Sequence, residues 1–248
     1  MKAMILAAGL GTRLRPLTND RPKALVTVAG RTLLEITLSR LRSFGVREVI
    51  VNAHHYAGII CNYLSENNNF GMEIKVSHED DLLDTGGGLK HAAWFFLEGG
   101  ASEPFILHNV DVLSTIDLGS MLRHHVGEQA LATLAVQYRE TSRYLLFDEK
   151  AQLCGRQAGR EGQPELVRPA ANVQALAFSG IHVISPRLLE MLSEEGAFSI
   201  IAAYLRLAAQ GENISAFRAD EFYWRDLGKP ENIAQAARDI ETGTYPGH

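Results

Sequence analysis

Strand and helix patterns alternate over the first ~110 residues, and this alternation limits the fold more than any other feature. The predicted strands cover 4–7, 48–51, 73–76 and 105–107, and the predicted helices cover 31–44, 56–66 and 87–97. Strands that alternate with helices form right-handed crossovers, which give a parallel sheet with helices on both faces. Such a sheet binds ligands beyond the carboxyl ends of its strands.

The second half of the chain is less regular. We expect strands at 131–137, 175–184 and 214–217, a hairpin from 144–147 to the residues near Leu153, and helices at 198–209 and 230–240, with another opened by Pro186. Gly155–Asn172 is polar and lacks a period, which predicts a flexible loop. These patterns favour one α/β domain with a small irregular C-terminal subregion. If the protein forms a homodimer, we expect the contact to lie in this subregion.

Composition excludes several classes of protein. The chain has 248 residues, 46% of them hydrophobic, and a net charge of -5, which argues against general binding to nucleic acid. No apolar run approaches the roughly 20 residues of a membrane span. Cys61 and Cys154 form no disulfide framework, and the N-terminus does not resemble a signal peptide. We therefore expect a cytoplasmic protein that binds neither membranes nor nucleic acid.

The first predicted strand leads into a loop rich in glycine and cations. Leu14 occupies the third glycine position of a dinucleotide fingerprint, and Lys23 lacks the glycine that precedes it in an ATPase phosphate loop. An ordinary glycine turn would not explain the cations. Gly9 and Gly11 allow backbone N–H groups to approach an anion, and Arg13 and Lys23 add charge, so the loop is suited to hold phosphate.

Five segments in the same order resemble the sugar-1-phosphate nucleotidylyltransferases, or NDP-sugar pyrophosphorylases. They are LAAGLGTRLRPLT with RPKAL at 6–25, DTGGG at 84–88, HNVD at 108–111, FSGIHV at 178–183 and WRDLG at 224–228. The short chain is most similar to the bacterial group that contains N-acetylmuramate-1-phosphate uridylyltransferase and mannose-1-phosphate guanylyltransferase-like enzymes. The resemblance implies a Rossmann-like three-layer α/β/α fold with a mostly parallel mixed sheet.

The reaction implied by this resemblance joins a nucleoside triphosphate (NTP) to a sugar-1-phosphate and releases pyrophosphate. A sugar phosphate is largely dianionic at neutral pH, so it can attack the α-phosphorus without a general base. The resemblance makes Arg13 and Lys23 the catalytic cations. It makes Asp111 and Asp226 the ligands of Mg²⁺, which prefers carboxylate oxygens. A lone aspartate after a strand is otherwise usually a turn former or a helix cap.

The resemblance also assigns substrate-binding residues in two halves, 1–115 for the NTP and 116–248 for the sugar phosphate. The nucleotide residues are Leu6, Ala7, Ala8, Gly9, Gly11, Thr12, Arg13, Glu79, Thr85 and Gly87, and the sugar-phosphate residues are Lys23, Asn109, Ser179 and Gly180. Each group has a structural alternative. Glu79 could be an exposed loop acid, 84–88 a glycine-rich helix entry, and Ser179-Gly180 a buried strand with a glycine bulge.

Two positions depart from the family pattern. Val110 replaces a small residue and could crowd the sugar. Many relatives also have a Glu-Lys-Pro segment whose lysine contacts the sugar phosphate, where this chain has Leu166-Val167-Arg168-Pro169. Whether Arg168 takes over that contact is left open by the sequence.

The residues do not show which base and which sugar are bound. From the resemblance we expect UTP and an N-acetylhexosamine-type 1-phosphate as substrates, for a cell-wall or polysaccharide precursor. The alternatives are GTP with mannose-1-phosphate or a similar sugar, and cytidylyl transfer to a polyol phosphate. A non-catalytic subunit that senses nucleotide sugars is the alternative of another class.

Overall fold

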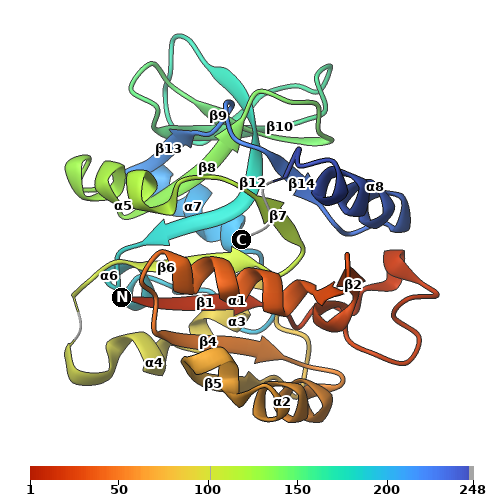
Figure 1. Cartoon of the computed structure of the whole chain (residues 1–248). Helices are drawn as coiled ribbons and strands as arrows, with labels where there is room; N and C mark the ends of the chain where they lie inside the picture. Colours follow the sequence, from red (N-terminus) through yellow and green to blue (C-terminus); the bar gives the residue numbers. More distant parts are fainter. Residues whose placement is uncertain (101, 246–248) are drawn as a thin grey trace.

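The computed structural model describes residues 1–100 and 102–245, which form a ten-stranded mixed sheet between two helical layers (Figure 1). The order along the sheet is β11-β10-β9-β12-β6-β1-β4-β5, and β8 pairs with both β12 and β13. The strands are β1 (Lys2–Leu6), β4 (Glu48–Ala53), β5 (Glu73–His78), β6 (Phe105–Asn109), β8 (Ala132–Gln137), β9 (Arg143–Phe147), β10 (Leu153–Ala158), β11 (Glu165–Leu166), β12 (Gln174–Ile184) and β13 (Ile214–Arg218).

The first four long strands form a parallel core, as the alternating pattern predicts. β1 lies between β4 and β6 and is parallel to both, and β5 is parallel to β4 (Figure 1). The centre of β1 is fully buried, because helices cover both faces of the sheet at Ala3, Met4 and Ile5. The carboxyl ends of these strands therefore meet at one edge.

The second half of the chain extends this sheet with antiparallel strands. β12 runs antiparallel to β6, β8 and β9, and β9 and β10 form the predicted hairpin. β12 thus joins the two halves of the molecule into one continuous sheet.

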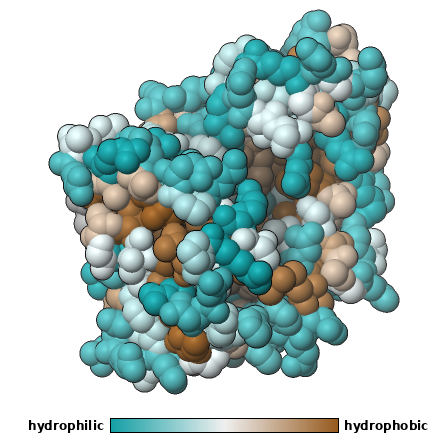
Figure 2. Space-filling model, turned by 90° about the vertical axis from the view of Figure 1, so that its right-hand side faces the viewer, coloured by the Kyte–Doolittle hydropathy of each residue, from teal (hydrophilic) through white to brown (hydrophobic). Residues whose placement is uncertain are grey.

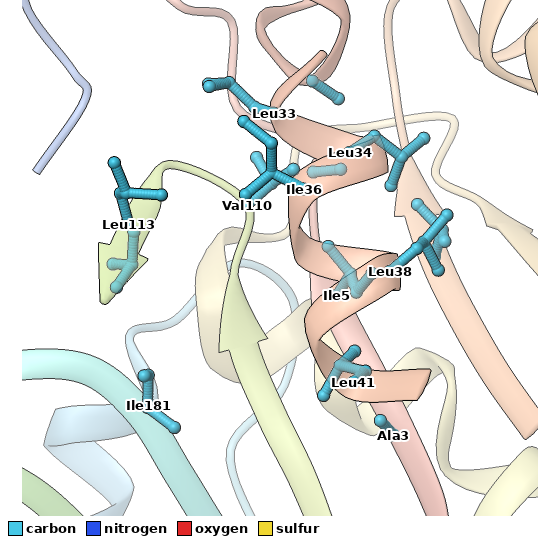
Figure 3. Packing of buried hydrophobic residues seen from close by; sticks show 14 of the residues in the cluster. Ala3, Ile5, Leu33, Leu34, Ile36, Leu38, Leu41, Val110, Leu113 and Ile181 are labelled. Atoms are coloured by element: carbon cyan, nitrogen blue, oxygen red, sulfur yellow. The ribbon is translucent and has the colours of Figure 1, made fainter. Parts of the chain in front are cut away.

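Eight helices make the two outer layers within the described residues. They are α1 (Leu33–Ser43), α2 (Ala57–Glu66), α3 (Asp84–His91), α4 (Ala93–Leu97), α5 (Leu118–Gly127), α6 (Arg187–Glu190), α7 (Ile200–Ala209) and α8 (Pro230–Glu241). Side chains of α1, α2, α5 and α8 pack in one hydrophobic cluster, and those of α3, α4, α6 and α7 in the other. Leu34, Leu38 and Leu41 of α1 recur at helical spacing and cover the sheet beside Ile5 (Figure 3).

The structure corrects two expectations. Residues 84–97 form two helices, α3 and α4, where we expect one over 87–97. Gly155–Asn172 is not wholly a loop: β10 continues to Ala158, and β11 pairs with it. This pairing requires a glycine at 155, since an added Cβ would lie 2.4 Å from the carbonyl oxygen of Glu165.

The sequence patterns also missed elements that position the site. The helix α5 and the strand pair β7 (Val112–Ser114) and β14 (Trp224–Asp226) have no predicted counterpart. The two strands are only three residues long, too short to show a period. No helix in 1–100 or 102–245 combines the length and apolar character needed to cross a bilayer.

Candidate active site

Two cavities lie at the carboxyl edge of the parallel strands and share part of one wall. The larger has a volume of about 590 Å³ and the smaller about 230 Å³. Asn109, at the end of β6, and Asp111, just beyond it, line both cavities. Figure 2 shows the face of the molecule on this side, with a central hollow in which apolar residues lie beneath hydrophilic ones. Ligands held in the two cavities would therefore meet at Asn109 and Asp111.

The smaller cavity is built from the residues assigned to the nucleotide. Its wall contains Leu6, Ala7, Ala8, Gly9, Glu79 and Thr85, together with Lys23, which the resemblance assigns to the sugar phosphate. Glu79 is 1% exposed, so it is not the exposed loop acid of the alternative interpretation. Its carboxylate accepts hydrogen bonds from Asn52 Nδ2 at 2.6 Å and from the Leu83 amide at 3.2 Å. These bonds hold the carboxylate at the cavity wall.

Asn52 is a site residue that the sequence analysis missed. Its Oδ1 accepts a hydrogen bond of 2.7 Å from the amide of Ala7, while its Nδ2 donates to Glu79. It lies near the end of β4, is 2% exposed and lines the smaller cavity. An amide at the end of an otherwise apolar buried strand was the available signal, because a buried polar side chain needs partners.

The glycines of 84–88 serve the packing of α3. A Cβ on Gly86 would lie 2.3 Å from the Phe198 ring, and one on Gly87 would lie 2.5 Å from the carbonyl oxygen of Gly196. Gly87 is buried and is not among the residues described at the cavity wall, whereas Thr85 is. Thr85 Oγ1 also accepts a hydrogen bond of 3.0 Å from the Ile200 amide. The helix-entry interpretation thus describes this backbone, with Thr85 at the cavity.

The loop after β1 places Lys23 against Asp111. Gly11 has a φ of +65°, and an added Cβ would lie 3.1 Å from the Lys23 Cβ, so glycine permits the loop to close. The ammonium of Lys23 forms an ion pair with Asp111 Oδ2. Gly11, Thr12 and Arg13 line neither cavity, and the Arg13 side chain is exposed.

Asp226 reaches the wall of the larger cavity through the short strand β14. β14 pairs antiparallel with β7, and the Leu227 amide donates to the Asp111 carbonyl at 2.8 Å. Asp226 Oδ1 accepts from the Gly228 amide at 2.5 Å. A Cβ on Gly228 would lie 2.6 Å from this oxygen and 2.9 Å from Arg13 Nη2, so Arg13 and Asp226 are neighbours.

An ion pair from α8 fixes β14 in place. Arg225, next to Asp226, contacts Asp239 Oδ2 at 2.8 Å, and the Tyr223 hydroxyl donates to the same carboxylate at 2.5 Å. Asn232 of α8 donates to the Asp226 carbonyl at 2.7 Å. The last helix thus positions a residue of the predicted metal site.

The larger cavity contains the residues assigned to the sugar phosphate, Asn109, Ser179 and Gly180. Asn109 Oδ1 and Ser179 Oγ are buried and have no hydrogen-bond partner among the described residues. Buried polar atoms usually have partners, so both are free to bind a ligand. Gly180 has a φ of +76° at a register shift between β12 and β8, which is the bulge that we gave as the alternative.

The structure places the two departures from the family pattern. Val110 is 3% exposed, belongs to the hydrophobic cluster beneath α1 and lines the smaller cavity (Figure 3). It therefore does not crowd the larger cavity. Arg168 forms an ion pair of 2.5 Å with Asp148 and lines neither cavity.

A partly buried cation in the larger cavity is a second residue that the sequence analysis missed. Arg139 follows β8 and lines this cavity together with Asp226. Burial lowers the pKa of Arg139, and the Asp226 carboxylate opposes that shift. No motif marks this arginine, since strand pairing alone brings it to the site.

Comparison with known proteins identifies the family. Residues 2–243 match the family model described as nucleotidyl transferase. The chain belongs to the nucleotidyl transferase family. It is 33% identical to N-acetylmuramate alpha-1-phosphate uridylyltransferase of Caulobacter vibrioides, over 96% of this chain and 97% of that protein. It is 30% identical to mannose-1-phosphate guanylyltransferase 1 of Arabidopsis thaliana, over 96% of this chain but 64% of that protein.

Solved structures confirm the predicted fold. HddC from Yersinia pseudotuberculosis matches with a TM-score of 0.76 and 23% identity, over 96% of this chain and 99% of that one. A Bacillus anthracis protein crystallised with sucrose matches with a TM-score of 0.78 and 15% identity, over 96% and 94%. The predicted enzyme class, a sugar-1-phosphate nucleotidylyltransferase, is thus confirmed, while the relatives divide between uridylyl and guanylyl transfer.

Proposed function

We propose that this enzyme transfers a uridylyl group from UTP to an N-acetylhexosamine-type 1-phosphate in the cytoplasm and releases pyrophosphate. The observation that carries the proposal is the wall shared by the two cavities at Asn109 and Asp111. The smaller cavity takes the nucleotide, mainly from residues 1–115, and the larger takes the sugar, mainly from 116–248. The attacking phosphate then meets the α-phosphate at this wall.

Positioning and charge neutralisation supply the catalysis. The sugar phosphate already carries the charge needed for attack, so no proton has to be removed. Lys23, held by Asp111 at the wall of the smaller cavity, neutralises the α-phosphate region as the two anions approach. Arg13, beside Asp226, holds the β- and γ-phosphates and stabilises the departing pyrophosphate.

The two aspartates fit a magnesium site. Asp111 and Asp226 both line the larger cavity, and they come from chain segments joined by the ladder of β7 and β14. No cluster of three acidic, histidine or cysteine ligands occurs among the described residues. Two carboxylates suffice for Mg²⁺, which takes its other ligands from water and substrate phosphates. When bound, the ion would neutralise charge on the α-phosphate.

The choice of UTP rests on a relative. The Caulobacter relative that matches this chain over nearly its whole length is a uridylyltransferase. In the smaller cavity the base would lie beside Glu79. Glu79 presents a carboxylate there that can accept an N–H from the base edge. Guanine also offers such N–H groups, so GTP with mannose-1-phosphate is the second candidate.

A matrix of four NTPs against several sugar-1-phosphates tests the proposal, with pyrophosphate release as the readout and Mg²⁺ present. We expect the highest kcat/KM for UTP with an N-acetylhexosamine-type 1-phosphate. A higher value for GTP with mannose-1-phosphate would replace the proposed substrates. Thermal stabilisation by nucleotides without pyrophosphate release from any pair would instead indicate a sensing subunit.

A further inference from the structure

Arg139 is held rigidly on the wall of the larger cavity. Its guanidinium carbon lies 3.6 Å from the centroid of the Trp224 ring, in a stacked cation–π contact. Its Nη2 donates a hydrogen bond of 2.6 Å to the Phe178 carbonyl. Trp224 is itself fixed, because its Nε1 donates to the Ser179 carbonyl at 2.7 Å. The guanidinium is thus preorganised between β12 and β14.

The guanidinium of Arg139 is not fully satisfied by the protein. Its Nε is buried and lacks a hydrogen-bond partner in the part of the chain that the structure describes. A buried N–H of a cation is costly to leave unpaired, so this group needs a partner that the described residues do not supply. Asn109 Oδ1 and Ser179 Oγ, which line the same cavity, also lack partners within the described residues.

The other arginines of the second half are less suited to bind an anion beside Asp226. Arg168 is occupied by Asp148 at 2.5 Å and by Gln152 at 2.9 Å. Arg143 and Arg156 line the larger cavity but are exposed, and Arg156 is paired with a surface glutamate at 2.6 Å. Among these, Arg139 alone combines partial burial, a fixed orientation and a place on the cavity wall beside Asp226.

We propose that Arg139 binds the 1-phosphate of the sugar substrate and orients it to attack the α-phosphorus of the NTP. This is the contact that the sequence left open for Arg168. The proposal rests on the function proposed above. A planar guanidinium can bind two phosphate oxygens at once, which orients the phosphate as well as neutralising it. Arg139 on the sugar side and Lys23 on the nucleotide side then place a cation behind each reacting phosphate.

The test compares Arg139→Gln with Arg168→Gln as a matched control, because the control removes an arginine of the same half outside both cavities. We expect Arg139→Gln to raise the KM for the sugar-1-phosphate about 10- to 100-fold, as for loss of a charged hydrogen bond, and to leave the KM for the NTP within about threefold. Arg139→Lys keeps the positive charge but loses the planar guanidinium. Its KM for the sugar-1-phosphate should lie between those of the wild type and Arg139→Gln. Arg168→Gln should match the wild type.

Calorimetric titration without NTP adds a readout that depends on binding alone. Arg139→Gln should weaken binding of the sugar-1-phosphate and leave binding of the same sugar without phosphate unchanged. Equal weakening of both ligands would indicate a structural role and overturn the proposal. A loss confined to sugars that carry a carboxylate would also overturn it, because Arg139 would then bind the carboxylate.

The outcomes separate this proposal from the proposed function. If the wild type releases no pyrophosphate from any pair of substrates, the proposed function fails, and the titrations still decide whether Arg139 binds the 1-phosphate. If the wild type is active and Arg139→Gln has an unchanged KM for the sugar-1-phosphate, only the role of Arg139 fails.

Discussion

Lys23 and Asp111 form an ion pair that joins the loop after β1 to the end of β6. The side chains are 13% and 15% exposed, so the pair is shielded from bulk water. Because Asp111 lines both cavities, the pair fixes a cation at the place where the substrates would meet.

Removal of this cation should abolish most of the activity. We expect Lys23→Ala to lower kcat by a factor of about a hundred or more, as for loss of a preorganised transition-state contact. Arg21→Ala is the matched control, since Arg21 lies in the same loop and pairs with Asp20 at the surface. Steady-state pyrophosphate release measures both variants. Equal activity of Lys23→Ala and the wild type would remove Lys23 from the mechanism.

Loss of one carboxylate should change the dependence on magnesium. We expect Asp226→Asn to require at least tenfold more Mg²⁺ for half-maximal activity, since one of two anionic ligands becomes neutral. Asp117→Asn is the control, because Asp117 caps α5 through the Ser120 amide and an asparagine can do the same. Activity is titrated with Mg²⁺ for each protein. An unchanged midpoint for Asp226→Asn would contradict the metal assignment.

The fold was largely predictable because its signals are local and repeated. The apolar runs of β1, β4 and β6 and the helical spacing of Leu34, Leu38 and Leu41 appear directly in the sequence. The pairing of the shortest strands was not predictable. β11 is an exposed two-residue strand, and only its ladder with β10 makes it one.

The motifs marked the cavity walls only in part, since Gly11, Thr12 and Arg13 belong to a quoted segment and line neither cavity. Gly9, Lys23, Asp111 and Asp226 belong to quoted segments, and all four line a cavity. Asn52 and Arg139 belong to no motif. Each reaches the site because a neighbouring strand sets its position, Asn52 beside β1 and Arg139 after β8.

Substitution of Gly180 should disturb the bulge that shapes the larger cavity. An alanine would be strained at a φ of +76°, and its Cβ would lie 2.8 Å from Val112 and 2.9 Å from Asn109. We expect Gly180→Ala to lower the free energy of unfolding by about 2–4 kcal/mol, the combined cost of strain and overpacking. Gly159→Ala isolates the strain, since its φ is +61° and no atom lies within 4 Å of the added Cβ. Urea unfolding compares the variants, and equal losses would exclude a packing role for Gly180.

Acid should destabilise the protein through His182. Burial, with the positive charge of His108 adding to it, lowers the pKa of His182 to about 3, from an ordinary value of 6.5. Below pH 6.5 the unfolded chain therefore binds a proton at His182 that the folded chain does not bind. Stability is complete above that pH and falls as the pH decreases towards the folded pKa, by up to about 1.4 kcal/mol per pH unit.

The variant His182→Gln tests this contribution, because glutamine does not titrate in this range. The substitution also changes the 2.9 Å hydrogen bond between His182 Nδ1 and the Tyr204 hydroxyl, which alters stability at every pH. The comparison therefore uses the slope of the free energy of unfolding against pH and not its absolute value. The free energy of unfolding is measured by urea between pH 6 and pH 4.5. We expect its slope against pH to be smaller in the variant than in the wild type by about 1.4 kcal/mol per pH unit, the effect of one proton. Equal slopes would show that His182 is not the group that opposes protonation in the folded protein.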